Sequence, residues 1–179
     1  MIELTSLLGA ALVIGLIVAW TLILGAPPAP SSAHQRKGLI GALPAEIKGE
    51  IWDLGSGFGG LARTLAEAYP QNPVIGREAS PLPWLVSWCL NRLKPVRAGN
   101  LAYQFGPAEA ADLTRAGLVT LYIGGKATAR VAEQLEGRLE AGTLVVSLFF
   151  AIRSWTPEQV LVLDDAQASR LYLYRIGGP

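Results

Sequence analysis

The sequence is poor in the residues that build disulfides and metal centres, and its charges almost balance. Its 179 residues include one cysteine, Cys89, and one histidine, His34. A single cysteine excludes an internal disulfide, and these two residues leave no Cys/His set for a metal site, so we expect neither. The formal net charge is +1, which provides no overall field to attract nucleic acid. We therefore expect no nucleic-acid partner, and the scarcity of cysteine suits a domain in a reducing cytoplasm.

Charged residues are also missing from one long stretch, Leu4–Ala26. As a helix this stretch would extend about 34 Å, at about 1.5 Å per residue, which is enough to cross a hydrocarbon core of about 30 Å. We therefore predict a transmembrane anchor over residues 1–26, with Trp20 at the interface. Only Glu3 is charged before the stretch, whereas basic residues follow it, so the positive-inside rule predicts a single-pass inner-membrane protein whose domain faces the cytoplasm.

A cleaved signal peptide is the alternative interpretation of the same stretch. Signal peptides have a basic amino-terminal region and a shorter apolar core, and this stretch has neither. The residues that follow, Gly25–Ser32, are rich in proline, alanine and serine, as in a semi-rigid linker. We expect an anchor over 1–26, a linker over 27–45 and one folded domain over 46–179.

The strongest signal for function lies at the start of that domain. The run Ile51–Gly59 reads as a buried strand followed by a glycine turn, and an acid, Glu78, stands further along the chain. Such a run is typical of the nucleotide-binding start of a doubly wound α/β domain, because glycine permits both the tight turn and the close approach of a ligand. The residues that we expect to bind a cofactor are Asp53, Gly55, Ser56, Gly57, Gly59, Glu78 and Gly124.

Asp53 distinguishes between two classes of cofactor that such a turn binds. A strand that binds NAD is normally apolar at this position, because the helix start behind it receives a pyrophosphate anion. S-adenosylmethionine instead carries an ammonium group, which the carboxylate of Asp53 can face directly or through water. Glu78 can accept hydrogen bonds from the ribose hydroxyls in either class. We therefore favour S-adenosylmethionine over NAD, although each acid taken alone also reads as an ordinary turn cap or solvated strand end.

Strand-like and helix-like segments alternate through the domain and end in a hairpin. The predicted strands are 50–54, 74–78, 101–105, 118–123, 143–152, 160–163 and 171–176, and the predicted helices are 60–69, 82–93 and 127–139. No helix separates the last two strands, so they should pair antiparallel. The expected fold class is α/β, a doubly wound Rossmann-like methyltransferase sheet with a C-terminal antiparallel hairpin, preceded by one transmembrane helix. A nicotinamide dehydrogenase would need a second half and a catalytic domain, for which the chain is too short.

These features give the chain a resemblance to the class I S-adenosylmethionine-dependent methyltransferases. More narrowly, it resembles the small membrane-anchored lysine methyltransferases that modify the ATP synthase c subunit and the adenine nucleotide translocase, and their prokaryotic relatives. The shared features are the apolar amino-terminal segment, Asp53–Gly57, Glu78, Pro83–Val86, Gly124 and Trp155–Pro157. The chain departs from that family at Phe58, where an acid is usual, and near Gly106, where Glu109 is the candidate substitute for an acid that contacts adenine.

The resemblance implies direct displacement of the sulfonium methyl by a lysine that has lost its proton, which a dry pocket favours. We assign no catalytic residue. Gly124–Gly125 should leave room for the acceptor at the mouth of the site. Tyr122 and Trp155 are candidate walls, and for Trp155 a place in the core is an equal alternative. Trp84 and Trp88, four residues apart on one predicted helix, are interpreted as packing residues.

Three functions remain open on the sequence alone. The first is methylation of a protein lysine, for which an integral membrane protein is the candidate partner. A variant of this first function is methylation of a lipid or small lipophilic molecule. The second is a non-catalytic membrane scaffold that keeps the fold. The third is a small nicotinamide-binding membrane protein, which Asp53 and the predicted C-terminal hairpin disfavour. Asp53 and Glu78 favour an enzyme over a scaffold, because a structural domain has no need of this pair.

Overall fold

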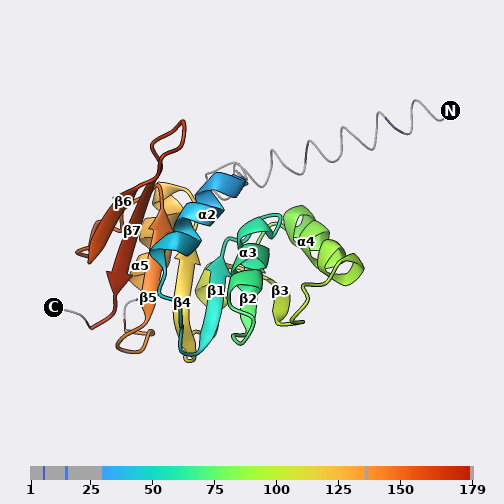
Figure 1. Cartoon of the computed structure of the whole chain (residues 1–179), viewed down its shortest axis with the longest axis horizontal. Coiled ribbons are helices and arrows are strands. Elements are labelled where there is room, and N and C mark those ends of the chain that lie inside the picture. The colour runs from blue at the N-terminus through green and yellow to red at the C-terminus, as the bar shows by residue number, and fades with distance from the viewer. Residues whose placement is uncertain (1–5, 7–14, 16–29, 136, 178–179) are drawn as a thin grey trace.

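A computed structural model of the chain describes residues 30–135 and 137–177, together with Ser6 and Gly15. It contains a seven-stranded sheet with helices packed against both faces (Figure 1). The predicted anchor over 1–26 lies outside the described residues, apart from those two positions. Within the part of the chain that is described, no helix combines the length and the apolar character needed to cross a bilayer.

The strands of the sheet lie in the order β3-β2-β1-β4-β5-β7-β6. The strands are β1 (Glu50–Leu54), β2 (Val74–Glu78), β3 (Leu101–Phe105), β4 (Ala116–Leu121), β5 (Leu144–Leu148), β6 (Gln159–Val162) and β7 (Arg170–Arg175). The helices are α2 (Ala33–Ala42), α3 (Gly60–Ala68), α4 (Pro81–Leu93), the short 3-10 helix η1 (Ala108–Ala110) and α5 (Gly125–Leu135). The first five strands are parallel, and β7 lies antiparallel between β5 and β6. The predicted alternation and the predicted final hairpin are both confirmed.

Strand β1 lies inside the sheet, between β2 and β4, and is buried along its whole length. Its side chains alternate between two cores. Ile51 packs with residues of α2 and α3 on one face, whereas Trp52 and Leu54 pack with residues of α5 on the other. Because side chains alternate along a strand, Asp53 shares the face of Ile51 and lies on the α3 side, near the carboxyl end of β1. The fold therefore puts a buried acid at the edge where open α/β sheets bind their ligands.

Helix α2 is the main departure from the sequence prediction, because it lies in the stretch 27–45 that was expected to be a linker. Ser32 caps the helix: its hydroxyl accepts a hydrogen bond from the Gln35 amide at 3.1 Å, and the Gln35 side chain accepts one from the Ser32 amide at 2.9 Å. Leu39 is 1% exposed and packs into the core. Gln35 Nε2 also donates to Ser169 Oγ at 3.0 Å. A helix that is capped and buried in this way is part of the folded domain and not a flexible connection.

Strand β5 ends at Leu148, earlier than the predicted end at residue 152. Phe149 has a φ of 73°, a left-handed conformation that interrupts the extended backbone. Its amide donates to the carbonyl of Arg170 at 2.8 Å, which holds the end of the strand against β7. The chain therefore turns away from the sheet at this point. Helix α5 likewise begins and ends earlier than the predicted 127–139.

Candidate active site

A cavity of about 730 Å³ opens at the carboxyl ends of β1, β2 and β4. This is the edge of a parallel sheet at which α/β proteins bind ligands. The walls come from the glycine turn after β1, the end of β2, the start of α4, the segments after β4 and β5, and the start of α2. The lining residues include Ser31, Arg36, Asp53, Gly55, Ser56, Gly57, Phe58, Glu78, Glu109, Tyr122, Gly124, Phe149, Phe150 and Gln167.

Asp53 is a buried carboxylate on the cavity wall, and only one of its oxygens is hydrogen-bonded. It lies opposite Thr120 in the register of β1 and β4, and Thr120 Oγ1 donates to Asp53 Oδ1 at 2.9 Å. The other oxygen, Oδ2, is buried and has no hydrogen-bond partner among the described residues. Burial raises the pKa of Asp53 to about 7, because apolar surroundings disfavour the charged form, and the Thr120 hydroxyl and the nearby Ala62 amide offset only part of this rise. A positively charged ligand group beside Oδ2 would stabilise the ionised carboxylate and satisfy this atom.

The glycine turn after β1 is held against the end of β2 by backbone hydrogen bonds. The amides of Gly55 and Ser56 donate to the carbonyl of Arg77 at 2.8 and 3.0 Å. Gly55 has a φ of +78°, and a Cβ at this position would lie 2.2 Å from Ile123 Cγ2. Only glycine therefore fits here, for reasons of both backbone conformation and space. The turn forms a fixed wall of the cavity, with its backbone open to the close approach of a ligand.

Glu78 connects this turn to the start of α4. Its Oε2 accepts a hydrogen bond from the Gly57 amide at 2.7 Å, and its Oε1 accepts one from the Ser80 amide at 2.7 Å. Each carboxylate oxygen retains a further acceptor position after these bonds. A carboxylate held by two amides at the edge of a cavity is suited to accept hydrogen bonds from two neighbouring hydroxyls.

Most of the residues predicted to bind a cofactor come together at the cavity wall. They are Asp53, Gly55, Ser56, Gly57, Glu78 and Gly124. Gly59, the remaining predicted residue, packs against Tyr103, whose hydroxyl donates to the Gly59 carbonyl at 2.8 Å. A Cβ on Gly59 would lie 2.2 Å from that hydroxyl oxygen, and its φ of +80° starts helix α3. Gly59 therefore serves the turn and the packing of Tyr103 rather than the cavity wall.

Aromatic side chains line the cavity beyond Gly124. The rings of Tyr122 and Phe149 stack with centroids 5.7 Å apart and planes inclined by 23°, and both residues line the cavity. Tyr122 is therefore found where the sequence predicted a wall. Trp155, the other candidate wall, is half-buried and packs edge-on against Tyr174, with ring centroids 5.7 Å apart, at the margin of the core on the α5 side. Trp155 does not line the cavity, and its place agrees with the alternative interpretation as an aromatic that packs at the core or its edge.

The two positions at which the chain departs from the resembling family both lie on the cavity wall. Phe58 is 39% exposed there, and it presents an aromatic ring in place of the usual acid. Glu109 also reaches the cavity, and its carboxylate pairs with Arg130 at 3.1 Å. The candidate substitute acid is therefore close to the site, with a cation of the chain beside it.

Sequence reasoning missed one wall of the cavity, which comes from the start of α2 and from the turn between β6 and β7. Ser31, Arg36 and Gln167 line the cavity from these two segments. Gln35 joins the segments through its hydrogen bond to Ser169. A serine followed three residues later by glutamine is a capping-box pattern, which could have revealed the helix. The contact between the helix and a turn more than a hundred residues later is a tertiary feature that no local pattern indicates.

A parallel sheet with an inserted antiparallel strand, and with acids at the carboxyl ends of its first two strands, is the arrangement of the class I S-adenosylmethionine-dependent methyltransferases. The chain is similar to an RNA methyltransferase of Salinibacter ruber in complex with S-adenosylhomocysteine, with a TM-score of 0.72, 23% identity, and coverage of 84% of this chain and 95% of that one. It is also similar to the tRNA methyltransferase TrmK of B. subtilis, with a TM-score of 0.65, 16% identity, and coverage of 83% and 67%. At these identities the likeness establishes the fold.

Residues 53–159, more than half of the chain, match the ANTKMT methyltransferase domain, and the chain belongs to this family. It is an S-adenosylmethionine-dependent methyltransferase, with S-adenosylmethionine as its cofactor. Among curated proteins, it is 29% identical over 128 residues to a protein-lysine N-methyltransferase of Saccharolobus islandicus (strain REY15A). This match covers 71% of the chain and 79% of the relative.

Proposed function

We propose that the protein is anchored in a membrane and transfers a methyl group from S-adenosylmethionine to a lysine of a membrane-associated protein. Its family and its relative named a protein-lysine N-methyltransferase support the choice of acceptor. The observation that carries the proposal is the half-satisfied carboxylate of Asp53 on the cavity wall. A buried acid of this kind lowers stability unless a ligand completes its hydrogen bonding.

In this proposal two carboxylates bind opposite parts of the cofactor. Asp53 Oδ2 accepts a hydrogen bond from the ammonium group, directly or through water, and Glu78 accepts hydrogen bonds from the ribose hydroxyls. Gly55, Ser56 and Gly57 offer backbone for close approach. The cofactor supplies a methyl group that its sulfonium has already activated, so the chain contributes by binding, orientation and exclusion of water.

The acceptor lysine is proposed to enter beside Gly124, past the stacked rings of Tyr122 and Phe149. Apolar walls disfavour an ammonium and lower the pKa of a lysine that enters, which makes its nitrogen available as a nucleophile. Burial also raises the pKa of the Tyr122 hydroxyl, so this wall stays neutral. We assign no general base, because desolvation of the lysine gives the same result without one.

Membrane attachment rests on the uncharged stretch Leu4–Ala26. Pro30 and Ser31, which follow it, line the cavity. An anchor over 1–26 would therefore hold the cavity close to the cytoplasmic surface of the inner membrane. An integral membrane partner would then present its lysine at a high effective concentration, without the need for a large substrate-binding insertion.

Methyl transfer to membranes tests this proposal. The full-length protein is incubated with S-adenosylmethionine carrying a radiolabelled methyl group and with membranes from cells that lack the protein, and the labelled material is hydrolysed. We expect the label in N-methyllysine, with loss of transfer in Asp53→Ala and retention in Glu50→Gln. Label in the lipid extract instead would show that the acceptor is a lipid and not a lysine. Cofactor binding without any transfer would favour the scaffold.

A further inference from the structure

Helix α4 exposes large apolar side chains to its outer side, and it buries few apolar residues against the sheet. Of this helix only Pro83 and Ser87 are buried. Leu85 is 47% exposed and Leu93 is 77% exposed. A surface helix ordinarily buries its apolar stripe and exposes its polar residues. The reversed arrangement leaves a hydrophobic surface that the described part of the chain does not cover, which is the mark of an interaction site.

Aromatic side chains extend this surface onto β3, an edge strand of the sheet. The ring centroid of Trp84 lies 6.4 Å from that of Trp88 and 5.3 Å from that of Phe105. Trp88 is 39% exposed and Phe105 is 51% exposed. Trp84 is half-buried and packs against both rings, as predicted for a packing residue, whereas Trp88 and Phe105 extend the contact to the surface. We call Trp84, Leu85, Trp88, Leu90, Leu93 and Phe105 the α4–β3 face.

The charged residues of the segment that carries the α4–β3 face, 79–108, are all positive. Arg92, Lys94 and Arg97 are exposed, and residues 79–108 contain no acid. The guanidinium carbon of Arg92 lies 5.0 Å from the ring centroid of Trp88, so cation and aromatic ring share one surface. Tryptophan and leucine combined with basic residues are typical of segments that lie in the interface of an anionic bilayer. Both the charge and the apolar area are thus complementary to such a membrane.

We propose that the α4–β3 face lies in the headgroup region of an anionic bilayer. The position of the cavity supports this orientation, because Leu82 and Pro83 at the start of α4 line the same cavity as Pro30 and Ser31. With α4 on the bilayer, the mouth of the cavity lies beside the membrane surface and its acceptors. This inference rests on the proposed anchor, which brings the domain to the membrane, and adds to it a second contact that depends on charge.

Site-specific labelling of the full-length chain tests this contact. In a Cys89→Ser background, Leu93→Cys or Val162→Cys carries an environment-sensitive fluorophore. Val162 is a matched control, because it is an apolar residue, 61% exposed, on β6 at the opposite edge of the sheet. Each protein is reconstituted into vesicles of phosphatidylcholine, with or without phosphatidylglycerol, and with lipids that carry nitroxide quenchers near the headgroup.

We expect the label at position 93 to shift to the blue and to be quenched in anionic vesicles, and the label at 162 to show neither change. Combining Arg92→Gln, Lys94→Gln and Arg97→Gln should weaken docking of the face by about 100-fold and remove the quenching at 93. No quenching at 93, or equal quenching at both positions, would overturn the proposal. A blue shift without quenching would also overturn it, because protein would then cover the face.

Flotation of the same vesicles separates this inference from the proposed anchor. A chain that floats while its label at Leu93 stays in water would overturn the bilayer contact and leave the anchor in place. A chain that does not float with any vesicle would overturn both. Flotation in every vesicle with quenching at Leu93 only in the anionic ones is the result that supports both.

Discussion

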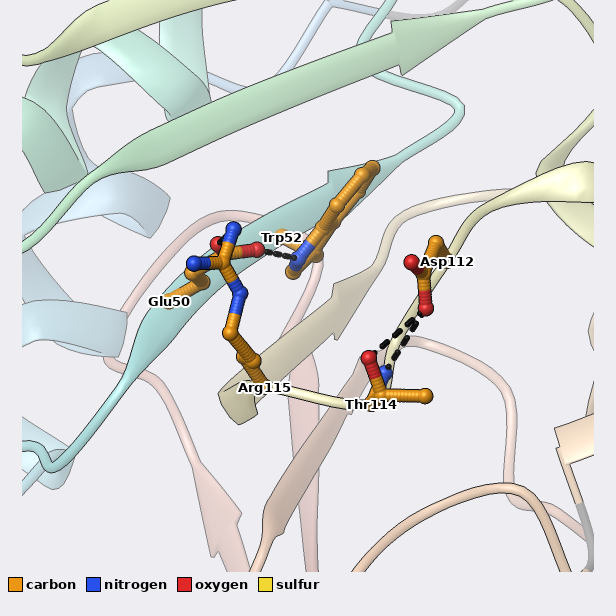
Figure 2. Close-up of polar contacts among 5 residues, drawn as sticks. All are labelled: Glu50, Trp52, Asp112, Thr114 and Arg115. Carbon is orange, nitrogen blue, oxygen red and sulfur yellow. Dashed lines mark hydrogen bonds and ion pairs between the residues drawn. The ribbon is translucent and has the colours of Figure 1, made fainter.

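Two carboxylates on one short strand have opposite surroundings. Glu50 begins β1 and Asp53 lies near its end, and they are 8% and 1% exposed. Both oxygens of Glu50 have partners: Arg115 forms an ion pair with Oε1, and Trp52 Nε1 donates to Oε2 at 3.0 Å (Figure 2). Asp53 has Thr120 on one oxygen and no partner among the described residues on the other.

At the Glu50 end of β1 the chain itself supplies the partners of the buried carboxylate, whereas at the Asp53 end a ligand is needed to supply one. Beside Glu50, Asp112 also finds its partners locally, since its Oδ1 accepts from the Thr114 amide at 3.2 Å and from the Thr114 hydroxyl at 2.8 Å (Figure 2). The carboxyl end of β1 instead holds a buried acid on a cavity wall, with one oxygen that has no hydrogen-bond partner among the described residues. Local rules of polar satisfaction are broken mainly at functional sites, so the comparison marks this end as the place of binding.

The largest effect is expected from Asp53→Ala, which removes the incomplete carboxylate. Affinity for S-adenosylmethionine should fall by about 100-fold, because a hydrogen bond between charged groups contributes about 1.5–3 kcal/mol. Isothermal titration with S-adenosylmethionine and S-adenosylhomocysteine measures this loss.

Asp53→Asn is the matched control for this prediction, because it keeps the size of the side chain and removes its charge. We expect it to bind almost as weakly as Asp53→Ala, yet to melt at a higher temperature than the parent at pH 8 without cofactor, since a buried charge is gone. Unchanged affinity in both variants would contradict the proposed role of Asp53.

An intermediate effect is expected from pH. The pKa of Asp53 is about 7 in the folded state against an ordinary value of 3.8, so the folded chain holds a proton that the unfolded chain has lost between these values. The free energy of unfolding without cofactor should therefore fall as pH rises across this window, by up to about 1.4 kcal/mol per pH unit. Affinity for the cofactor should rise over the same window, by up to about tenfold per unit, because the ammonium pairs with the ionised acid.

Urea unfolding and calorimetric titration over this pH window check both slopes. In Asp53→Asn the contribution of this group is absent, so both slopes should become smaller than in the parent. Equal slopes in the parent and in the variant would mean that another group controls the pH dependence.

The smallest effect on the cofactor is expected from Glu50→Gln, at the complete end of the strand. The variant loses the ion pair with Arg115, whose side chain is 80% exposed, and keeps an acceptor for Trp52. The free energy of unfolding should fall by about 1 kcal/mol at most, while cofactor affinity changes by less than about twofold. Urea unfolding and titration on the same protein measure both. A loss of affinity as large as that of Asp53→Ala would contradict the conclusion that only the Asp53 end of β1 binds the cofactor.

The sequence predicts the bounds of some strands better than those of others, for physical reasons. Strands β1, β2 and β3 have their predicted bounds, because turn signals flank short strand-like runs. The prediction for β5 was too long, because its apolar run continues to Ile152, which is 1% exposed but lies in a loop. Burial keeps such a residue apolar whether or not its backbone is extended, so composition does not show where the strand ends.

The site shows the same division. The predicted residues that line the cavity were found because the carboxyl ends of parallel strands meet at one edge of the sheet. Gly59 does not line the cavity, because it packs against Tyr103, and the spacing of a glycine motif does not show which glycine faces a cavity and which faces a neighbouring side chain. The wall from α2 was missed because a Pro- and Ser-rich stretch reads locally as a linker.

The sequence by itself determined the order of the elements, the glycine turn and the class of cofactor, because these depend on the spacing and periodicity of residues that lie close together in the chain. Only the tertiary structure decided that Asp53 Oδ2 lacks a partner, that α2 closes the cavity and that the outer face of α4 is apolar. These properties depend on contacts between segments far apart in the sequence, and burial exists only once those segments have packed together.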